Sequence, residues 1–331
     1  MRNLITDVAG LQIGQAHDMA AATGVTVALF DRPTVASVAI LGGAPGARET
    51  ALLEPEMTVG HVDAIVLSGG SAHGLAAADG AMGWLVSQNR GFPVGGLRVP
   101  IVPQAILFDL LNGGDKPWAR TGALSPYRAL GAAAIASAAA DFALGTQGAG
   151  FGATTRNLKG GIGSASARAA TGQIVGALVA VNAVGSATIG EGPHFWAAPY
   201  EQEGEFGGLG WPARIDPRDL AIRFKGGPGE NTTIALVATD AVLTKAQCKR
   251  LALAAHDGLA RALRPVHAPL DGDIVFAAAT GRSGAPSDAL ALAELCATAA
   301  DVLARAVARG VHAATALPFP GALPAWRDRF G

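Results

Sequence analysis

The sequence has no surplus of charge of either sign. Its 331 residues include 25 Lys and Arg against 26 Asp and Glu, which gives a formal net charge of −1. Because the basic residues are scattered rather than gathered into a stripe, nothing indicates a nucleic-acid partner or an anionic membrane surface. Gly or Pro interrupts the longer apolar runs, and the first residues lack the apolar core of a signal peptide. We therefore expect a cytoplasmic protein with no membrane and no nucleic-acid partner.

Cysteine and aromatic residues are also scarce. The two cysteines, Cys248 and Cys296, lie in predicted helices without a CxxC partner or the spacing of metal ligands, so we interpret both as core packing residues. The histidines show no HExxH-like spacing. Aromatic residues make up only 5% of the chain, so its core must consist mainly of Ala, Val, Leu and Ile. The sequence thus predicts a globular protein with no metal site and no cofactor.

The chain does contain an alternation of short strands and Ala-rich helices. Strands rich in β-branched or aliphatic residues are predicted at 24–30, 35–40, 174–181 and 274–279. Helices are predicted at 71–86, 127–140, 244–263 and 287–309. Thr244 and Gln247 form a capping box for the third helix, while Ser287 is the expected N-cap of the fourth and Gly310 lies just beyond its end. Because similar elements occur throughout, we predict one mixed α/β domain over residues 1–331.

Residues 201–229 differ from the rest of the chain. They are polar, rich in Gly and Pro, and only weakly periodic. Such a composition is typical of a mobile surface linker, which can present a scissile bond or be displaced after cleavage.

A glycine turn at residues 68–74 follows a predicted strand and precedes a predicted helix, as phosphate-binding turns do. However, the GxGxxG spacing is absent and no Walker Lys follows. Ser71 and His73 are poor candidates for a nucleophile and its base, because residues two apart at a helix start do not face each other. A structural turn is the better explanation, and nucleotide binding stays open as the weaker one.

The junction between Asn231 and Thr232 carries the strongest chemical signal. Turn residues 228–231 run without a spacer into a β-branched strand that opens with Thr232. A Thr hydroxyl is a weak nucleophile at neutral pH, and an α-amine with a pKa of about 7.7 to 8 is the simplest base for it. Only cleavage of the Asn231–Thr232 peptide bond would create that amine. The junction therefore suggests a self-cleaving hydrolase with an N-terminal Thr nucleophile.

Four further polar residues are candidates for the same site. Asp271 and Asp273 flank Gly272 before an apolar strand, where residues two apart point to the same side. They could orient the amine, although a turn that only starts a strand is the commoner explanation. Lys159 lies in a glycine-rich loop and is either solvated or close enough to the amine to favour its neutral form. Asn182 interrupts an apolar strand and either stabilises an oxyanion or makes a structural hydrogen bond.

Together these segments resemble the DmpA-type peptidase family of N-terminal nucleophile hydrolases, and within it the nylon oligomer hydrolases. The resemblance spans nearly the whole chain. The motifs that carry it lie at residues 42–50, 67–75, 99–110, 229–233 and 265–273. It implies an α/β fold of the DmpA and ornithine acetyltransferase type, a four-layer α/β/β/α-like sandwich. It also implies self-cleavage into an α chain of residues 1–231 and a β chain of residues 232–331, which remain associated.

The resemblance implies roles for individual residues as well. The catalytic residues that it indicates are Thr232, Lys159, Asn182, Asp271 and Asp273. Aminopeptidase members tend to carry a Gly-Ser junction and a Ser-x-Glu pair, so the Thr and Asp-Gly-Asp version here favours the nylon hydrolases. Two features depart from that group, because Phe108 replaces a Tyr and the loop after Lys159 is shorter. The implied substrate is a short peptide or oligomeric amide, and the implied assembly is a homo-oligomer, a tetramer or larger.

Three other functions stay open. An L-aminopeptidase or β-peptidyl aminopeptidase would use the same chemistry but would also bind the free amine of its substrate. An acyltransferase of the ornithine acetyltransferase type would use a Thr nucleophile after self-cleavage and would pass the acyl group to an amine. A binding protein that keeps the fold would never be cut.

Overall fold

The computed structural model describes residues 1–226, 231–284 and 288–331. Within these ranges, nine strands form a mixed sheet in the order β3-β7-β4-β2-β11-β10-β9-β8, with β1 paired to β2, while β5 and β6 form a separate hairpin. The strands are β1 (Leu11–Asp18), β2 (Thr23–Ile40), β3 (Ala47–Arg48), β4 (His61–Ser68), β5 (Phe92–Val94), β6 (Leu97–Val99), β7 (Gln104–Ile106), β8 (Ile162–Arg168), β9 (Ile174–Asn182), β10 (Thr232–Thr239) and β11 (Ile274–Ala279). The α-helices are α1 (Ala77–Ser87), α2 (Trp118–Thr121), α3 (Tyr127–Ala136), α4 (Lys245–Ala262), α5 (Ala289–His312) and α6 (Trp326–Phe330).

The sheet is folded so that its two halves enclose a core. Strand β2 pairs with β1 and β4 along its first part and with β11 along its last part, and its register against β4 shifts between Leu29 and Thr34. Phe30 and Leu67 of one half belong to the same buried cluster as Leu236 and Phe276 of the other. The alternate residues of β9, β10 and β11 pack against α4 and α5 in a second cluster, as the period of two in a strand requires.

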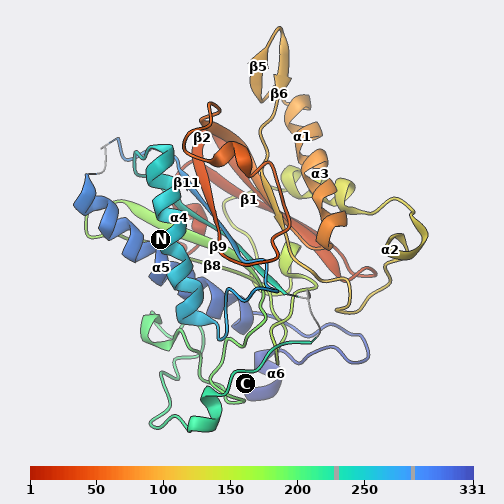
Figure 1. The fold of residues 1–331 in the computed structure, drawn as a ribbon, viewed down its shortest axis with the longest axis vertical. Coiled ribbons are helices and arrows are strands. Elements are labelled where there is room, and N and C mark those ends of the chain that lie inside the picture. Colours follow the sequence, from red (N-terminus) through yellow and green to blue (C-terminus); the bar gives the residue numbers. More distant parts are fainter. Residues whose placement is uncertain (227–230, 285–287) are drawn as a thin grey trace.

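A third cluster lies between α1, α3 and the strands β2 and β4. Figure 1 shows α4 and α5 together on one side of the sheet and α1 and α3 on the other. The order of layers is therefore helix, sheet, sheet, helix, which confirms the predicted four-layer α/β/β/α arrangement. Strands β9, β10 and β11 are buried on both faces, which explains why their sequences are almost continuously apolar.

Several predicted boundaries need correction. The two strands predicted at 24–30 and 35–40 are one continuous strand, β2, because its irregularity bends the strand without ending it. The helix predicted from residue 71 begins as a 3-10 turn, Ser71–Ala76, and becomes α-helical only at Ala77. The helix predicted at 127–140 ends at Ala136. The capping box of Thr244 and Gln247 at the start of α4 is confirmed.

Gly310 was predicted to lie beyond the end of the last long helix, but it lies inside α5. The reason is close packing of this helix against β8. A Cβ atom on Gly310 would lie 2.8 Å from the Gly163 nitrogen, and one on Gly163 would lie 1.8 Å from the Ala306 carbonyl oxygen. Both glycines therefore serve the contact between helix and strand. Asp288 caps the helix by accepting a hydrogen bond from Ala291 N at 2.8 Å, whereas the predicted cap, Ser287, falls outside the described residues.

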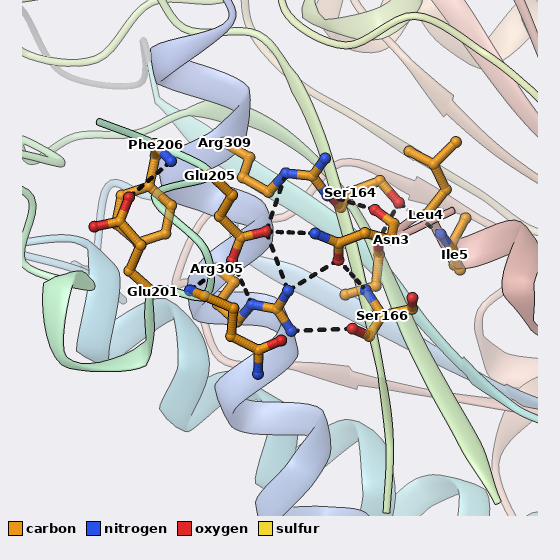
Figure 2. Close-up of polar contacts among 12 residues, drawn as sticks. Asn3, Leu4, Ile5, Ser164, Ser166, Glu201, Glu205, Phe206, Arg305 and Arg309 are labelled. Atoms are coloured by element: carbon orange, nitrogen blue, oxygen red, sulfur yellow. Dashed lines mark hydrogen bonds and ion pairs between the residues drawn. The ribbon is translucent and has the colours of Figure 1, made fainter. Parts of the chain in front are cut away.

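The predicted mobile linker is anchored at its beginning, which corrects the interpretation of residues 201–206, whereas most of residues 207–224 are exposed, as expected of a surface segment. Phe206 is buried in the main core and packs against Phe195 with ring centroids 5.4 Å apart. Glu205 forms an ion pair with Arg305 of α5, as Figure 2 shows. The apolar contact and the ion pair fix this part of the segment to the body of the domain. Residues 227–229 of the predicted linker lie outside the described ranges.

Among the described residues, no helix combines the length and the hydropathy that a transmembrane span requires.

Candidate active site

Thr232 lies at the start of a central strand. It opens β10 and is directly opposite Asn182, the last residue of the neighbouring antiparallel strand β9. On the other side, Asn231 makes an isolated parallel bridge to Asp271. Only 4% of Thr232 is exposed, and its hydroxyl donates a hydrogen bond to the carbonyl oxygen of Asn231. The hydroxyl oxygen thus lies beside the peptide group whose cleavage the sequence predicts.

The Asp-Gly-Asp turn packs directly against this hydroxyl. A Cβ atom on Gly272 would lie 2.7 Å from Thr232 Oγ1, so only glycine leaves room for the Thr232 hydroxyl. The early glycine motif holds the turn from behind, because Ala44 N donates to the Asp271 carbonyl at 2.8 Å. A Cβ atom on Gly42 would lie 2.2 Å from the Asp273 nitrogen. Two motifs more than two hundred residues apart in the sequence therefore form one wall of the site.

Asp273 is fully buried and well supplied with hydrogen-bond donors. Its Oδ1 accepts from Thr233 N at 2.9 Å. Its Oδ2 accepts from His267 N at 3.0 Å and from the His267 ring at Nδ1, 2.8 Å away. These three hydrogen bonds fix the orientation of the Asp273 carboxyl group next to Thr233, the residue that follows Thr232.

Asp271 lies in a different electrostatic environment. Burial, followed by the negative charge of Asp273, raises the pKa of the Asp271 carboxyl to about 8. A hydrogen bond between the two carboxyl groups acts in the same direction, and Gly272 N donates to Asp271 Oδ1 at 2.9 Å. The raised pKa favours the protonated form of Asp271 at neutral pH. Two carboxyl groups whose environments separate their pKa values are a common arrangement in acid–base sites.

Asp271→Asn is expected to reduce the pH dependence of thermal stability. The pKa of Asp271 is raised in the folded state, so its contribution to stability is complete below the unfolded value and is lost as the pH rises through about 8. Asn has nearly the same shape as a protonated Asp but does not ionise, so the variant should not lose stability as the pH rises. Melting temperatures at pH 5 and pH 8 should differ less in Asp271→Asn than in the unsubstituted protein. Asp141→Asn, at a largely exposed carboxylate, is the control and should follow the unsubstituted curve. Parallel curves for both variants would contradict the assignment of the proton.

Asn182 is fully buried and its amide has a fixed orientation. Its Oδ1 accepts hydrogen bonds from Lys225 Nζ at 2.9 Å, Thr154 N at 3.0 Å and Asn112 Nδ2 at 3.2 Å. Its Nδ2 donates to the carbonyl oxygen of Phe108 at 2.9 Å. Three donors on Oδ1 leave only one assignment of the amide, with its N–H groups directed away from them. Phe108 thus contributes a backbone carbonyl here, which does not depend on the Tyr-to-Phe difference.

Lys159 is buried rather than solvated, with 1% of its surface exposed. Its ammonium donates to the carbonyl oxygens of Ala153 at 2.7 Å, Gly160 at 2.8 Å and Gly150 at 3.0 Å. Burial and then the positive charge of Lys225 lower the pKa of Lys159 to about 7. All three acceptors belong to the loop 150–160, which contacts Asn182 through Thr154 N. The influence of Lys159 on the Thr232 amine stays a prediction.

A cavity of about 260 Å³ opens next to Asn182. It is lined by Asn112, Thr154 and Lys225, which all bind the Asn182 amide oxygen, and by the loop 319–323. The cavity is a candidate ligand site, since residues that line it contact Asn182, which is directly opposite Thr232 in the sheet. Asn112, Lys225 and His267 were missed as site residues in the sequence. Asn112 and Lys225 have no local motif of their own and contact Asn182, whereas His267 lies in the motif at 265–273, which assigned it no role, and contacts Asp273.

Three other expectations concern groups away from this junction. Within the described ranges, no three His, Cys, Asp or Glu side chains gather as metal ligands. The glycine turn 68–74 has a structural role, because Gly70 N donates to Asp109 Oδ1 at 2.8 Å and a Cβ atom on Gly70 would overlap the Tyr127 ring. Both cysteines are free, with Cys248 buried in the main core as predicted.

Known proteins with similar sequences and folds are peptidases and amidases. An uncharacterized aminopeptidase of Mycobacterium tuberculosis is 45% identical, over 99% of this chain and 98% of its own length. A 6-aminohexanoate-oligomer endohydrolase of Agromyces is 28% identical, over 85% of this chain and 76% of its own length. Among solved structures, a Burkholderia β-aminopeptidase has a TM-score of 0.69 at 25% identity and covers 98% of this chain and 90% of its own.

The L-aminopeptidase D-Ala-esterase/amidase of Ochrobactrum anthropi, described as a variant of the Ntn hydrolase fold, has a TM-score of 0.69 at 22% identity. It covers 96% of this chain and 88% of its own, and at this identity it shows the fold alone. The sequence model of peptidase family S58 matches residues 3–322. Because this match includes the strand junction, the Asp-Gly-Asp turn and the elements that support them, the chain belongs to peptidase family S58 and is a hydrolase of peptide or amide bonds.

Proposed function

We propose that the protein is a self-processing N-terminal threonine amidohydrolase that acts on short peptides or oligoamides. The observation that carries the proposal is the position of Thr232. It opens a central strand between Asn182 on one side and the Asp271–Asp273 pair on the other. A nucleophile with an oxyanion donor and a carboxylate pair around it has the parts that acyl transfer requires.

In the proposed self-cleavage, Thr232 Oγ1 attacks the carbonyl carbon of Asn231. The peptide C–N bond then breaks, the nitrogen takes up the proton of the hydroxyl, and an ester links Asn231 to Thr232 Oγ1. Water hydrolyses this ester, which leaves a carboxylate on Asn231 and a free amine and hydroxyl on Thr232. Asn182 Nδ2 is the candidate donor to the oxyanion, because the three donors on its Oδ1 fix the direction of its N–H groups.

In the proposed turnover, the same hydroxyl attacks an external amide. The Thr232 amine accepts the hydroxyl proton and passes it to the leaving amine, and water then hydrolyses the acyl ester. The Asp273 carboxylate and the Asp271 carboxyl would orient the amine, since both lie at the Gly272 turn that contacts Thr232. The cavity beside Asn182 is the proposed site for the acyl part of the substrate.

Denaturing mass spectrometry of the purified protein tests self-processing directly. The proposal predicts two chains whose masses correspond to residues 1–231 and 232–331, and a freshly made sample should convert to them with time without an added protease. A single chain of 331 residues after prolonged incubation, in a folded sample, would contradict it. Cleavage at any other bond would also do so.

An aminopeptidase specificity is the second candidate, because the relatives that are 45% identical are named aminopeptidases whereas the named oligomer hydrolases are 27–28% identical. Turnover of amino-acid amides should be compared with turnover of 6-aminohexanoate trimers and of the same trimers acetylated at their amine. An aminopeptidase loses activity when the amine is blocked. An endo-acting amidase cleaves both forms of the trimer.

A further inference from the structure

We propose that His267 is a positioning residue of this site. By donating two hydrogen bonds to Asp273, it stabilises the negative charge on that carboxylate and so keeps the shared proton of the carboxyl pair on Asp271. The proposal rests on the function proposed above. It adds a residue that is not itself in contact with the nucleophile and a role that no motif in the sequence indicates.

The backbone of His267 is the first observation. Its φ is +55°, in the left-handed region that residues other than glycine rarely adopt. This conformation lets one residue direct two donors at one oxygen, because both His267 N and His267 Nδ1 bind Asp273 Oδ2, at 3.0 and 2.8 Å. An unusual backbone conformation that serves a single polar contact is a reasonable basis for a functional hypothesis.

The tautomer of His267 follows from its partner. A carboxylate oxygen can only accept, so Nδ1 carries a hydrogen and donates it to Asp273. The other oxygen of Asp273, Oδ1, accepts a hydrogen bond from Thr233 N at 2.9 Å. The ring of His267 is thus connected through one carboxylate to the backbone of the residue that follows the nucleophile.

His256 of α4 supports the His267 ring from behind. The two rings pack edge to face with centroids 4.8 Å apart, and His256 Nε2 donates to the Ala39 carbonyl at 3.1 Å. Burial lowers the pKa of His256 to about 4, although its hydrogen bond to Ala39 opposes the shift. His256 is therefore uncharged at neutral pH and contributes packing rather than charge.

The electrostatic consequence concerns the carboxyl pair. Two adjacent buried carboxyl groups carry one proton between them, and it resides on the group with the weaker set of donors. Asp273 receives three N–H groups, two of them from His267, whereas Asp271 receives two backbone N–H groups, from Gly272 and Val184. Loss of the ring donor would reduce this difference. The pair would then take up its second proton at a higher pH.

The experiment uses three substitutions in the full-length protein. His267→Gly keeps the backbone N–H and adopts a positive φ readily, so it removes only the ring. His267→Asn and His267→Asp form a matched pair of nearly equal shape, and both tolerate this backbone. Asn retains a donor for Asp273, whereas Asp replaces it with a second negative charge.

We expect His267→Gly to slow self-cleavage and kcat by about 10- to 100-fold, as the loss of a supporting hydrogen bond commonly does, with little change in KM. The acidic limb of its pH profile should move to higher pH. His267→Asn should recover most of the rate and the original limb, and His267→Asp should be slower than His267→Asn. His256→Gln, which can still donate to Ala39, should leave the limb unchanged and exclude His256 as its origin.

Equal rates and equal pH profiles for the Asn and Asp variants, with wild-type folding by circular dichroism, would overturn the role of His267. So would an unchanged profile in His267→Gly. Either result leaves the proposed function intact as long as the unsubstituted protein is cut at Asn231–Thr232. The charged and titratable groups that contact the ring are Asp273 on the turn and His256 on α4, and these interact in turn with Asp271 and Asp257.

Discussion

Replacement of Thr232 by Ala is expected to leave one uncut chain of 331 residues without amidase activity. Ala lacks the hydroxyl that would attack the Asn231 carbonyl, and the uncut chain has no α-amine at this position to act as the base. Removing the nucleophile of a covalent hydrolase typically lowers kcat by about 10⁶-fold. Thr232 is a small side chain at the end of a strand, so the fold should survive the change. Intact mass and amide turnover, measured on the same sample, check both parts of the prediction.

Two control variants separate the role of the hydroxyl from general damage to the junction. Thr232→Ser keeps a hydroxyl and should still be cut and active. Thr233→Val changes the neighbouring residue, which is fully buried and whose hydroxyl has no hydrogen-bond partner among the described residues. Because Val has nearly the same shape, this variant should also be cut. A Thr232→Ala protein that is cut and hydrolyses amides would refute the proposal.

The elements around the nucleophile were predictable because their sequence signals are local. The β-branched run after Thr232, the apolar strand after Asp273 and the capping box at Thr244 each carry their signal within a few residues. The resemblance then indicated which of these segments meet. The structure brings Thr232, Asn182 and the Asp pair together at neighbouring strand ends, and their catalytic roles stay predictions. Lys159 instead donates hydrogen bonds to backbone carbonyl groups, among them that of Ala153.

What could not be predicted depends on contacts between distant segments. His267 and Asp273 are only six residues apart, but the contact requires a positive φ that the sequence does not announce for a histidine. Lys225 and Asn112 reach Asn182 from 43 and 70 residues away. The sequence around Gly310 resembles a helix end, but this glycine allows α5 to pack closely against β8. That contact is between distant segments, so the local sequence does not indicate it. The contacts that anchor Glu205 and Phe206 are also with distant segments, so the local sequence does not indicate them.

Arg305→Met is expected to lower the free energy of unfolding by about 3 to 5 kcal/mol, the usual cost of removing one partner from a buried ion pair. Arg305 is 2% exposed and its Nε binds Glu205 Oε1 at 2.6 Å. It also donates to Ser166 O at 3.0 Å and to Asn3 Oδ1 at 2.9 Å (Figure 2). Although burial raises the pKa of Glu205, the hydrogen bond and charge of Arg305 outweigh it and hold that pKa below the usual value. Methionine would leave a buried carboxylate with one remaining arginine, Arg309.

Urea unfolding in the uncut Thr232→Ala background measures this cost without chain separation. Arg2→Met is the matched control, because Arg2 pairs with Asp141 at the surface, where such pairs contribute about 0 to 1 kcal/mol. The double variant Arg305→Met, Glu205→Leu should recover much of the lost stability, since it removes the unpaired charge as well. Equal urea midpoints for Arg305→Met and Arg2→Met would contradict the prediction.

The same ion pair has a further consequence if the chain is cut at Asn231–Thr232. Asn3 and Glu205 would then belong to the chain of residues 1–231, and Arg305 and Arg309 to the chain of residues 232–331. Arg309 Nε lies 3.3 Å from Glu205 Oε2 and its guanidinium also donates to the carbonyl of Asn3, so two arginines of one chain would hold two segments of the other. In cut protein, Arg305→Met should therefore lower the urea concentration at which the two chains separate on a sizing column. Separation at an unchanged urea concentration, together with the expected loss of stability in the uncut background, would show that this ion pair does not hold the two chains together.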